Sequence, residues 1–163
     1  MTKVYDFRRV TRADYDMLAE WRKEQHVVEW WGTSEPHDDT ALADARVARW
    51  IVSCEGRPFA YMQDYTVHGW PDHPCAHLPA GSRGIDQFIG PPDMLGRGHG
   101  TAFIAARIAS LVSEGAPVIA VDPHPDNARA IASYRKAGFA VEGPARDTQW
   151  GRILPMVMQA GPR

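Results

Sequence analysis

Hydrophobic and polar positions follow one another along the chain in a way that predicts strands separated by helices. Short runs that are apolar, or that alternate with period two, predict strands at residues 4–10, 47–54, 59–67, 83–89, 118–121, 139–143 and 152–159. Helical spacing of apolar residues predicts helices after Thr11, from the end of a glycine-rich run to about Glu114, and over 127–137. Residues 26–45 are expected to form a loop with a short helix, and the Pro- and Gly-rich residues 68–81 a loop. This order predicts one α/β domain over residues 1–163.

Particular residues mark the ends of these elements. Thr11 followed by Asp14 resembles a capping box, and residues 55–58 (EGRP) predict a hairpin turn between two strands. Asn127 begins the last helix and Gly138 ends it. The long helix before it is expected to bury one face, formed by Phe103, Ile104, Ile108, Leu111 and Val112.

The glycine-rich run stands between a predicted strand and a predicted helix. It reads Gly96-Arg97-Gly98-His99-Gly100-Thr101. Glycines let a backbone approach an anion closely, and the first N–H groups of the following helix point toward it. The run matches neither the dinucleotide pattern G-x-G-x-x-G nor a P-loop. It therefore predicts a phosphate site of another kind, with a merely flexible helix entry as the alternative.

Composition narrows the classes of protein that fit. The 163 residues are 44% hydrophobic and 23% charged, which is typical of a globular domain. A net charge of −2 gives no electrostatic reason to expect nucleic acid as a partner. No apolar run approaches the ~18 residues of a membrane helix. Neither cysteine, Cys54 or Cys75, has the setting of a nucleophile. We expect a soluble, cytoplasmic protein with reduced thiols and no membrane contact.

Charge is distributed unevenly along the chain. Residues 26–45, 58–82 and 108–128 contain no Lys or Arg but hold ten acids: Glu29, Glu35, Asp38, Asp39, Asp44, Asp64, Asp72, Glu114, Asp122 and Asp126. Basic residues gather around the glycine-rich run and the last helix: Arg83, Arg97, Arg107, Arg129, Arg135 and Lys136. Acidic loops are often merely solvated. Because Trp30, Trp31 and Trp70 lie in the acidic segments, we favour a site for a cationic sugar there.

Asp86 lies in the middle of the otherwise apolar strand 83–89, where a carboxylate is uncommon. It could pair with an arginine, or it could bind an ammonium group and take its proton as a general base, with Gln87 orienting it. Asp122 follows the apolar strand 118–121, and ligands gather at strand ends in α/β sheets. We therefore expect Asp122 to bind an amino group of the substrate, with Asp72 and Asp126 as weaker candidates.

Four potential metal ligands lie close together in the loop 68–81, namely His68, His73, Cys75 and His77. Their spacing is too tight for the usual zinc patterns. We expect no metal, and we interpret the loop as a rigid lid over the acceptor.

Two sets of motifs resemble a known superfamily. Leu95-Gly96-Arg97-Gly98-His99-Gly100-Thr101 and Asn127-Ala128-Arg129-Ala130-Ile131 with Tyr134-Arg135-Lys136-Ala137-Gly138-Phe139 resemble the GNAT superfamily of N-acetyltransferases. Leu95 departs from the superfamily pattern, which has Gln or Arg at that position. The resemblance implies a mixed, mostly antiparallel α/β (α+β) sheet of six to seven strands, flanked by about four helices and splayed between strands 83–89 and 118–121. It also implies acetyl-coenzyme A as co-substrate, bound through its pyrophosphate.

Further motifs are similar to the aminoglycoside 6′-N-acetyltransferases within that superfamily. They are His26-Val27-Val28-Glu29-Trp30-Trp31-Gly32, Arg83-Gly84-Ile85-Asp86-Gln87 and Asp122-Pro123-His124-Pro125-Asp126-Asn127. The resemblance implies acetyl transfer to the 6′-amine of an aminoglycoside, giving drug resistance, in a monomer or homodimer. The alternatives are a GNAT enzyme for another amine, of siderophore lysine or peptide type, or a non-catalytic acyl-coenzyme A-binding module.

The resemblance also implies roles for individual residues. Asp86 is the base and Tyr134 protonates the leaving thiolate, although Tyr134 could simply pack. The expected coenzyme contacts are Gln87, Phe88, Ile89, Leu95, Gly96, Arg97, Gly98, His99, Gly100, Thr101, Asn127, Arg129, Ala130, Tyr134 and Lys136. The expected acceptor contacts are Glu29, Trp30, Trp31, Tyr65, Trp70, Asp72, Asp86, Gln87, Asp122 and Asp126.

Overall fold

The computed structural model describes residues 4–32 and 37–161. Its strands are β1 (Tyr5–Arg9), β2 (Val47–Cys54), β3 (Arg57–Thr66), β4 (Arg83–Ile89), β5 (Val118–Val121), β6 (Ala140–Val141), β7 (Arg146–Thr148), β8 (Gly151–Ile153) and β9 (Met156–Gln159). Its α-helices are α1 (Tyr15–Arg22), α2 (Gln25–Trp31), α3 (Asp39–Ala43), α4 (His99–Ser113) and α5 (Ala128–Ala137). Short 3-10 helices occupy Arg12–Asp14, Val67–Gly69 and Pro92–Met94.

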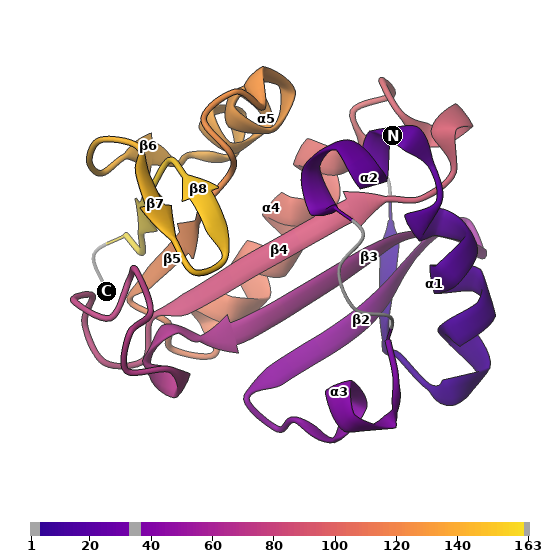
Figure 1. Cartoon of the computed structure of the whole chain (residues 1–163), viewed down its shortest axis with the longest axis horizontal. Helices are drawn as coiled ribbons and strands as arrows, with labels where there is room; N and C mark the ends of the chain where they lie inside the picture. The colour runs from indigo at the N-terminus through magenta and orange to yellow at the C-terminus, as the bar shows by residue number, and fades with distance from the viewer. Residues whose placement is uncertain (1–3, 33–36, 162–163) are drawn as a thin grey trace. The chain divides into compact units, whose positions relative to one another are not determined.

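Seven of the strands form one sheet in the order β1-β2-β3-β4-β5-β9-β6, and β7 and β8 form a separate hairpin (Figure 1). β4 and β5 run parallel and pair through Arg83 with Ile119 and through Gly84 with Ala120. The pairs β1–β2, β5–β9 and β6–β9 are antiparallel. The predicted mixed and mostly antiparallel sheet is confirmed.

The strand predictions hold best where the pattern is strongest. β4 and β5 occupy the predicted residues. The turn between β2 and β3 is confirmed at Glu55 and Gly56, whose φ angles of 51° and 81° are both positive. Two positive φ angles are what a tight hairpin with the twist of its strands requires.

The C-terminal strand prediction was wrong in one respect. Residues 152–159 form two strands, β8 and β9, which belong to different sheets. Pro155 separates them, and a proline lacks the N–H that would continue a ladder. β8 turns back on β7 through Gly151, whose φ is 111°. Period-two patterning shows that residues are extended but not which neighbour they pair with.

The helix predictions are also largely confirmed. Asn127 caps α5 by accepting from the Ala130 N–H at 3.2 Å, and Gly138 ends it with φ 108°. The Thr11 N–H donates to Asp14 Oδ2 at 2.8 Å, as in the predicted capping box. The described residues form five α-helices where about four were expected, because both α2 and α3 lie within residues 25–45. None of the described helices is long and apolar enough to cross a membrane.

Residue contacts divide the chain into two compact units, and β3 and β4 contribute residues to both. Unit 1 comprises Met1–Asp64 and Asp86–Phe103, and unit 2 comprises Tyr65–Ile85 and Ile104–Arg163. The core cluster of unit 1 contains Val10, Leu18, Trp21, Val27, Ile51, Tyr61 and Phe88. Buried residues of unit 2 include Ile104, Ile108, Leu111, Val118, Ile119, Val121, Phe139 and Met156. The single-domain interpretation stays a prediction.

Gly84 in β4 and Gly90, which directly follows β4, allow aromatic rings to lie close against the backbone. In unit 2, a Cβ built on Gly84 would lie 2.4 Å from the Tyr65 ring. In unit 1, a Cβ on Gly90 would lie 2.2 Å from the Trp21 ring. Both distances are far inside van der Waals contact, so these two rings fix the positions of the backbone they cover.

Candidate active site

Asp86 is held in β4 by a side chain from β3. Gln63 Nε2 donates to Asp86 Oδ2 at 2.9 Å, and Tyr61 Oη donates to Gln63 Oε1 at 2.7 Å. All three residues belong to unit 1, and Tyr61 is completely buried. The sequence singled out Asp86 but missed Gln63 and Tyr61. The signal for Gln63 was present, since it is also a polar residue within an apolar strand.

Aromatic rings pack around Tyr61. The Trp31 ring meets Tyr61 edge-on at 6.0 Å and Phe88 at 4.9 Å between centroids. The His37 ring lies 4.6 Å from Tyr61, and burial lowers the pKa of His37 to about 4, so the ring is neutral at pH 7. Trp31 therefore packs against the core cluster of unit 1, whereas Trp30 is 38% exposed. Of the predicted acceptor residues on α2, Glu29 and Trp30 face solvent.

The glycine-rich turn of unit 1 has the backbone that an anion site needs. Gly96 and Gly98 have φ angles of 72° and 80°, and a Cβ on either would meet nothing within 4 Å. Both glycines and Arg97 are exposed, and α4 begins directly afterwards at His99. The first N–H groups of a helix have no acceptor within it. These donors, together with the Arg97 cation, fit a diphosphate group.

The side chain of His99 packs against aromatic rings of unit 1. Its Nδ1 is 2.9 Å from Tyr5 Oη, and its ring meets Tyr5 edge-on and tilts against Phe59. Only 6% of the residue is exposed. The imidazole is therefore engaged by Tyr5 and Phe59, and the expected coenzyme contact of His99 stays a prediction. The backbone of His99 still begins α4.

Unit 2 holds the predicted residues around β5 and α5. Asp122 follows β5 directly and is half-buried. Tyr134 is 7% exposed and packs edge-on against Phe139 at 5.5 Å. Asp126 has an exposed side chain 3.8 Å from His124 Nδ1. The roles expected of these residues remain predictions.

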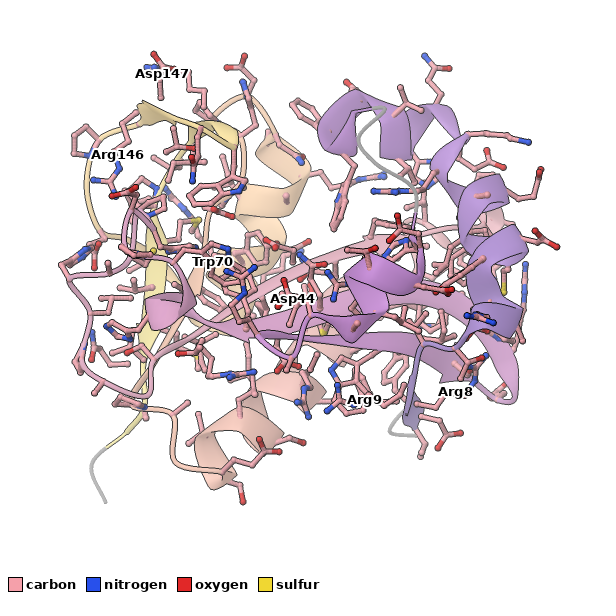
Figure 2. All side chains as sticks on the ribbon, turned by 60° about the horizontal axis from the view of Figure 1, so that its bottom comes forward. Arg8, Arg9, Asp44, Trp70, Arg146 and Asp147 are labelled. Atoms are coloured by element: carbon pink, nitrogen blue, oxygen red, sulfur yellow. The ribbon has the colours of Figure 1, made fainter. Side chains whose placement is uncertain are left out.

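An aromatic cluster in unit 2 joins the loop after β3 to the β7–β8 hairpin. The Tyr65 ring meets the Trp70 ring edge-on, with 5.6 Å between their centroids, and it tilts against the His73 ring at 5.4 Å. The centroids of the His73 and Trp150 rings are 5.5 Å apart. Arg146 Nη2 also donates to the Pro74 carbonyl at 2.6 Å. Figure 2 labels Trp70, Arg146 and Asp147 in this part of the molecule. The sequence pointed to Tyr65 and Trp70 as acceptor contacts, but it considered His73 only as a potential metal ligand. It missed Trp150 because the hairpin that carries this residue was not predicted.

His68 and His73 form hydrogen bonds within this loop, and His77 reaches a carboxylate outside it. His68 Nε2 lies 2.9 Å from the Leu78 carbonyl, and His73 Nδ1 accepts from the Cys75 N–H at 3.1 Å. His77 Nε2 lies 2.8 Å from Glu142 Oε1. Burial, and to a smaller extent His68, lowers the pKa of His73. Within residues 4–32 and 37–161, no three His, Cys, Asp or Glu side chains form a group that could hold a metal ion.

Several acids of the predicted acidic segments are engaged in local structure. Asp38 caps α3 through the Ala41 N–H, and Arg46 holds the pKa of Asp44 down at about 2. Arg12 Nε donates to Asp39 Oδ1 at 2.8 Å, and Trp50 Nε1 to Asp64 Oδ2 at 2.7 Å. Glu35 lies outside the described residues. The acidic segments therefore contribute fewer carboxylates to an acceptor site than their composition suggested.

Comparisons with known proteins agree with the motifs. Residues 10–146 match the acetyltransferase (GNAT) domain family. Aminoglycoside N(6′)-acetyltransferase type 1 of Klebsiella pneumoniae is 35% identical over 151 residues, which cover 83% of this chain and 74% of that protein.

Solved structures give the same result. A structure of the aminoglycoside acetyltransferase AAC(6′)-Ib with coenzyme A and kanamycin is similar, with a TM-score of 0.85 at 34% identity over 96% of this chain and 95% of that chain. A structure of AAC(6′)-Ib with paromomycin and acetyl-coenzyme A has a TM-score of 0.85 at 34% identity, over 95% and 93% of the two chains.

Proposed function

The chain belongs to the GNAT acetyltransferase family, and from that membership we propose that it transfers the acetyl group of acetyl-coenzyme A to the 6′-amine of an aminoglycoside. The observation that carries the proposal is the carboxylate of Asp86 in β4, bound by the Gln63 amide at 2.9 Å. A positioned carboxylate of this kind can bind an ammonium group and accept its proton. The similarity to an aminoglycoside N(6′)-acetyltransferase over 83% of the chain supports the choice of acceptor. Acetylation of such a drug would give resistance to it.

Two side chains move protons in the proposed reaction. Asp86 takes a proton from the 6′-ammonium, directly or through a water, and the freed amine attacks the thioester carbon. The Tyr134 hydroxyl gives its proton to the sulfur as the C–S bond breaks. The attacking nitrogen loses its second proton to water as the amide forms. The products are the amide and the free thiol, with one proton on Asp86, a phenolate on Tyr134 and one proton released to solvent. Exchange with solvent returns both groups to their starting states, and no acyl group is attached to the protein.

The chain's own backbone would hold the coenzyme. The donors of residues 96–101 and the start of α4 would bind the pyrophosphate, with Arg97 adding positive charge. Backbone N–H groups at Gln87 and Phe88 would polarise the thioester carbonyl as charge develops on its oxygen. When bound, the coenzyme supplies the activated acetyl group.

The acceptor would be held by carboxylates and aromatic rings. Asp122 would bind an amino group of the drug, and the ring of Trp70 would contact a sugar face. Asp72 and Asp126 are further candidates for ammonium groups. Because several carboxylates engage several amines, the geometry of charge would orient the drug.

A comparison of two drugs tests the proposed position of transfer. Kanamycin A has an amine at the 6′ position, whereas paromomycin has a hydroxyl there. A deprotonated amine is a competent nucleophile, and a hydroxyl of much higher pKa is not. We expect kanamycin A to be acetylated and paromomycin at most to inhibit, as measured by thiol release and by mass spectrometry of the product.

Parallel assays with a lysine derivative and a short peptide distinguish the proposal from the alternatives. Rapid acetylation of paromomycin on nitrogen would show that another ring position meets the thioester. Turnover of the lysine derivative or the peptide in preference to kanamycin A would assign the enzyme to a different amine.

A further inference from the structure

A chain of hydrogen bonds in unit 1 runs from a buried tyrosine to Asp86. Tyr61 and Gln63 are two positions apart on β3, so their side chains lie on the same face of the strand. Tyr61 Oη donates to Gln63 Oε1 at 2.7 Å, and Gln63 Nε2 donates to Asp86 Oδ2 at 2.9 Å. Each link has the length of a normal hydrogen bond.

The tyrosine decides which end of the amide faces Asp86. A glutamine amide presents either its oxygen or its NH2 group, and the two orientations fill nearly the same space. Because Tyr61 donates to the amide oxygen, the NH2 group is turned toward the carboxylate. The reverse orientation would set the amide oxygen against a carboxylate oxygen. Tyr61 is completely buried, and burial raises the pKa of its hydroxyl, so it remains a donor throughout the neutral pH range.

The charged groups around this chain come from several elements. Asp86 acts on Tyr61 from β4 and raises its pKa, whereas Arg49 of β2 and Arg22 of α1 lower it. The His37 ring lies 4.6 Å from Tyr61 and is neutral at pH 7, with its pKa lowered to about 4 by burial. His37 is therefore not expected to change its charge between pH 5 and 8.

We propose that Gln63 and Tyr61 are positioning residues for the catalytic base, holding the Asp86 carboxylate in one orientation and in its ionised form. This inference rests on the proposed role of Asp86 in proton transfer. The Gln63 N–H stabilises the charged carboxylate, and Tyr61 keeps that N–H directed at it. A hydrogen bond to the charged form of an acid lowers its pKa, so the base stays ionised to lower pH.

Two variants test the proposal through the pH dependence of the reaction. Gln63→Met removes the donor and keeps the length of the side chain, and Tyr61→Phe removes only the hydroxyl. For Gln63→Met we expect the acid limb of kcat/KM to move up by about one pH unit, because losing a hydrogen bond to a charged group changes an ionisation constant about tenfold. Tyr61→Phe should move it in the same direction by less. The affinity for coenzyme A should not change.

The next residue of β3 provides a matched control. Asp64 is 1% exposed, projects to the other face of the strand, and accepts from Trp50 Nε1 at 2.7 Å. Asp64→Asn alters a buried polar group of the same strand without touching the chain to Asp86. It should leave the acid limb in place. Thermal unfolding and coenzyme A binding show that each variant is folded.

A double-mutant cycle separates this inference from the proposed function. With Asp86→Asn already present, Gln63→Met should cause no further loss of turnover. A further loss of similar size in that background would overturn the positioning role. So would an unmoved acid limb in both Gln63→Met and Tyr61→Phe while Asp86→Asn abolishes turnover. Wild-type turnover in Asp86→Asn itself would instead remove the base, and the inference with it.

Discussion

Asp86 combines two properties that rarely meet in a sheet residue, a position in the middle of a strand and a carboxylate bound by an amide. The sequence alone identifies the position, because the residues around Asp86 in β4 are mainly apolar. It does not identify the partner, since Gln63 is 23 positions away along the chain.

At this residue we predict that Asp86→Asn lowers turnover at neutral pH about 10²–10⁴-fold, the usual cost of losing a general base. Acetyl-coenzyme A affinity should remain nearly that of the wild type. Steady-state kinetics and calorimetric titration measure the two quantities. Asp122→Asn is the comparison, and it should act mainly on the KM of the acceptor. Unchanged turnover in Asp86→Asn would place the base elsewhere.

A second residue-scale prediction concerns stability and pH. Arg8, labelled in Figure 2, donates two hydrogen bonds to Asp14, at 2.7 and 2.8 Å, and these bonds hold the pKa of Asp14 below its usual value although burial opposes them. A carboxyl whose pKa is lower in the folded state adds stability above its unfolded pKa. That stability is lost as the pH falls through the folded value.

We therefore expect Asp14→Asn to melt several degrees below the wild type at pH 7, with a loss of about 1–3 kcal/mol in unfolding free energy. The difference should begin to shrink below about pH 4, where the unfolded carboxyl takes up a proton, and it should disappear once the pH has fallen through the lowered pKa of the folded carboxyl. Differential scanning calorimetry across that range measures it. A constant difference at every pH would mean that packing at residue 14, and not its charge, is responsible.

At the scale of elements, prediction succeeded where local chemistry decides the outcome. The Asn127 cap, the Gly138 terminus and the Glu55-Gly56 turn all follow from side chains or φ angles within a few residues. Prediction from sequence failed where the structure depends on which distant segments pair with each other. The β7–β8 hairpin and the separation of β8 from β9 depend on which strand each segment meets, and sequence periodicity carries no such information.

The entry of α4 gives an element-scale prediction. Gly98→Val should weaken coenzyme A binding, because it puts a branched side chain at φ 80° in the proposed pyrophosphate cradle. The backbone strain should cost about 1–3 kcal/mol of stability. Gly56→Val is the matched control: Gly56 has φ 81°, also with open space around its Cβ position, but it lies in the β2–β3 turn.

The two variants should lose similar stability in thermal unfolding, and only Gly98→Val should lose coenzyme affinity. Equal affinity for coenzyme A in Gly98→Val and Gly56→Val would show that the pyrophosphate does not lie at this turn.

At the scale of the whole molecule, the coenzyme should stabilise the fold. A ligand that binds only the native state raises the unfolding free energy by about 2.7 kcal/mol at 100 times its Kd. Coenzyme A should therefore raise the melting temperature measurably, and NAD and ATP should raise it much less. A shift with ATP as large as that with coenzyme A would contradict the assignment of the glycine-rich turn. Differential scanning fluorimetry is sufficient for this comparison.

The whole molecule also shows what sequence reading leaves out of a site. The motifs identified residues one at a time, including Asp86, Tyr134 and Trp70, but not the groups that hold them. Tyr61, Gln63, His37 and Trp150 carry no motif of their own. They matter through contacts made across the fold, so only a structure brings them into view.

The close packing of Tyr65 over Gly84 has a consequence for how this sequence can change over time. With only 2.4 Å between the ring and the position of a Cβ, any side chain at residue 84 requires a smaller residue at 65. A substitution at either site alone would disturb the packing of the ring on the backbone and lower the stability of the fold. We therefore expect residues 84 and 65 to change together among descendants of this chain. Only descendants that retain glycine at residue 84 can retain an aromatic ring at residue 65. That ring is needed for the cluster that includes Trp70.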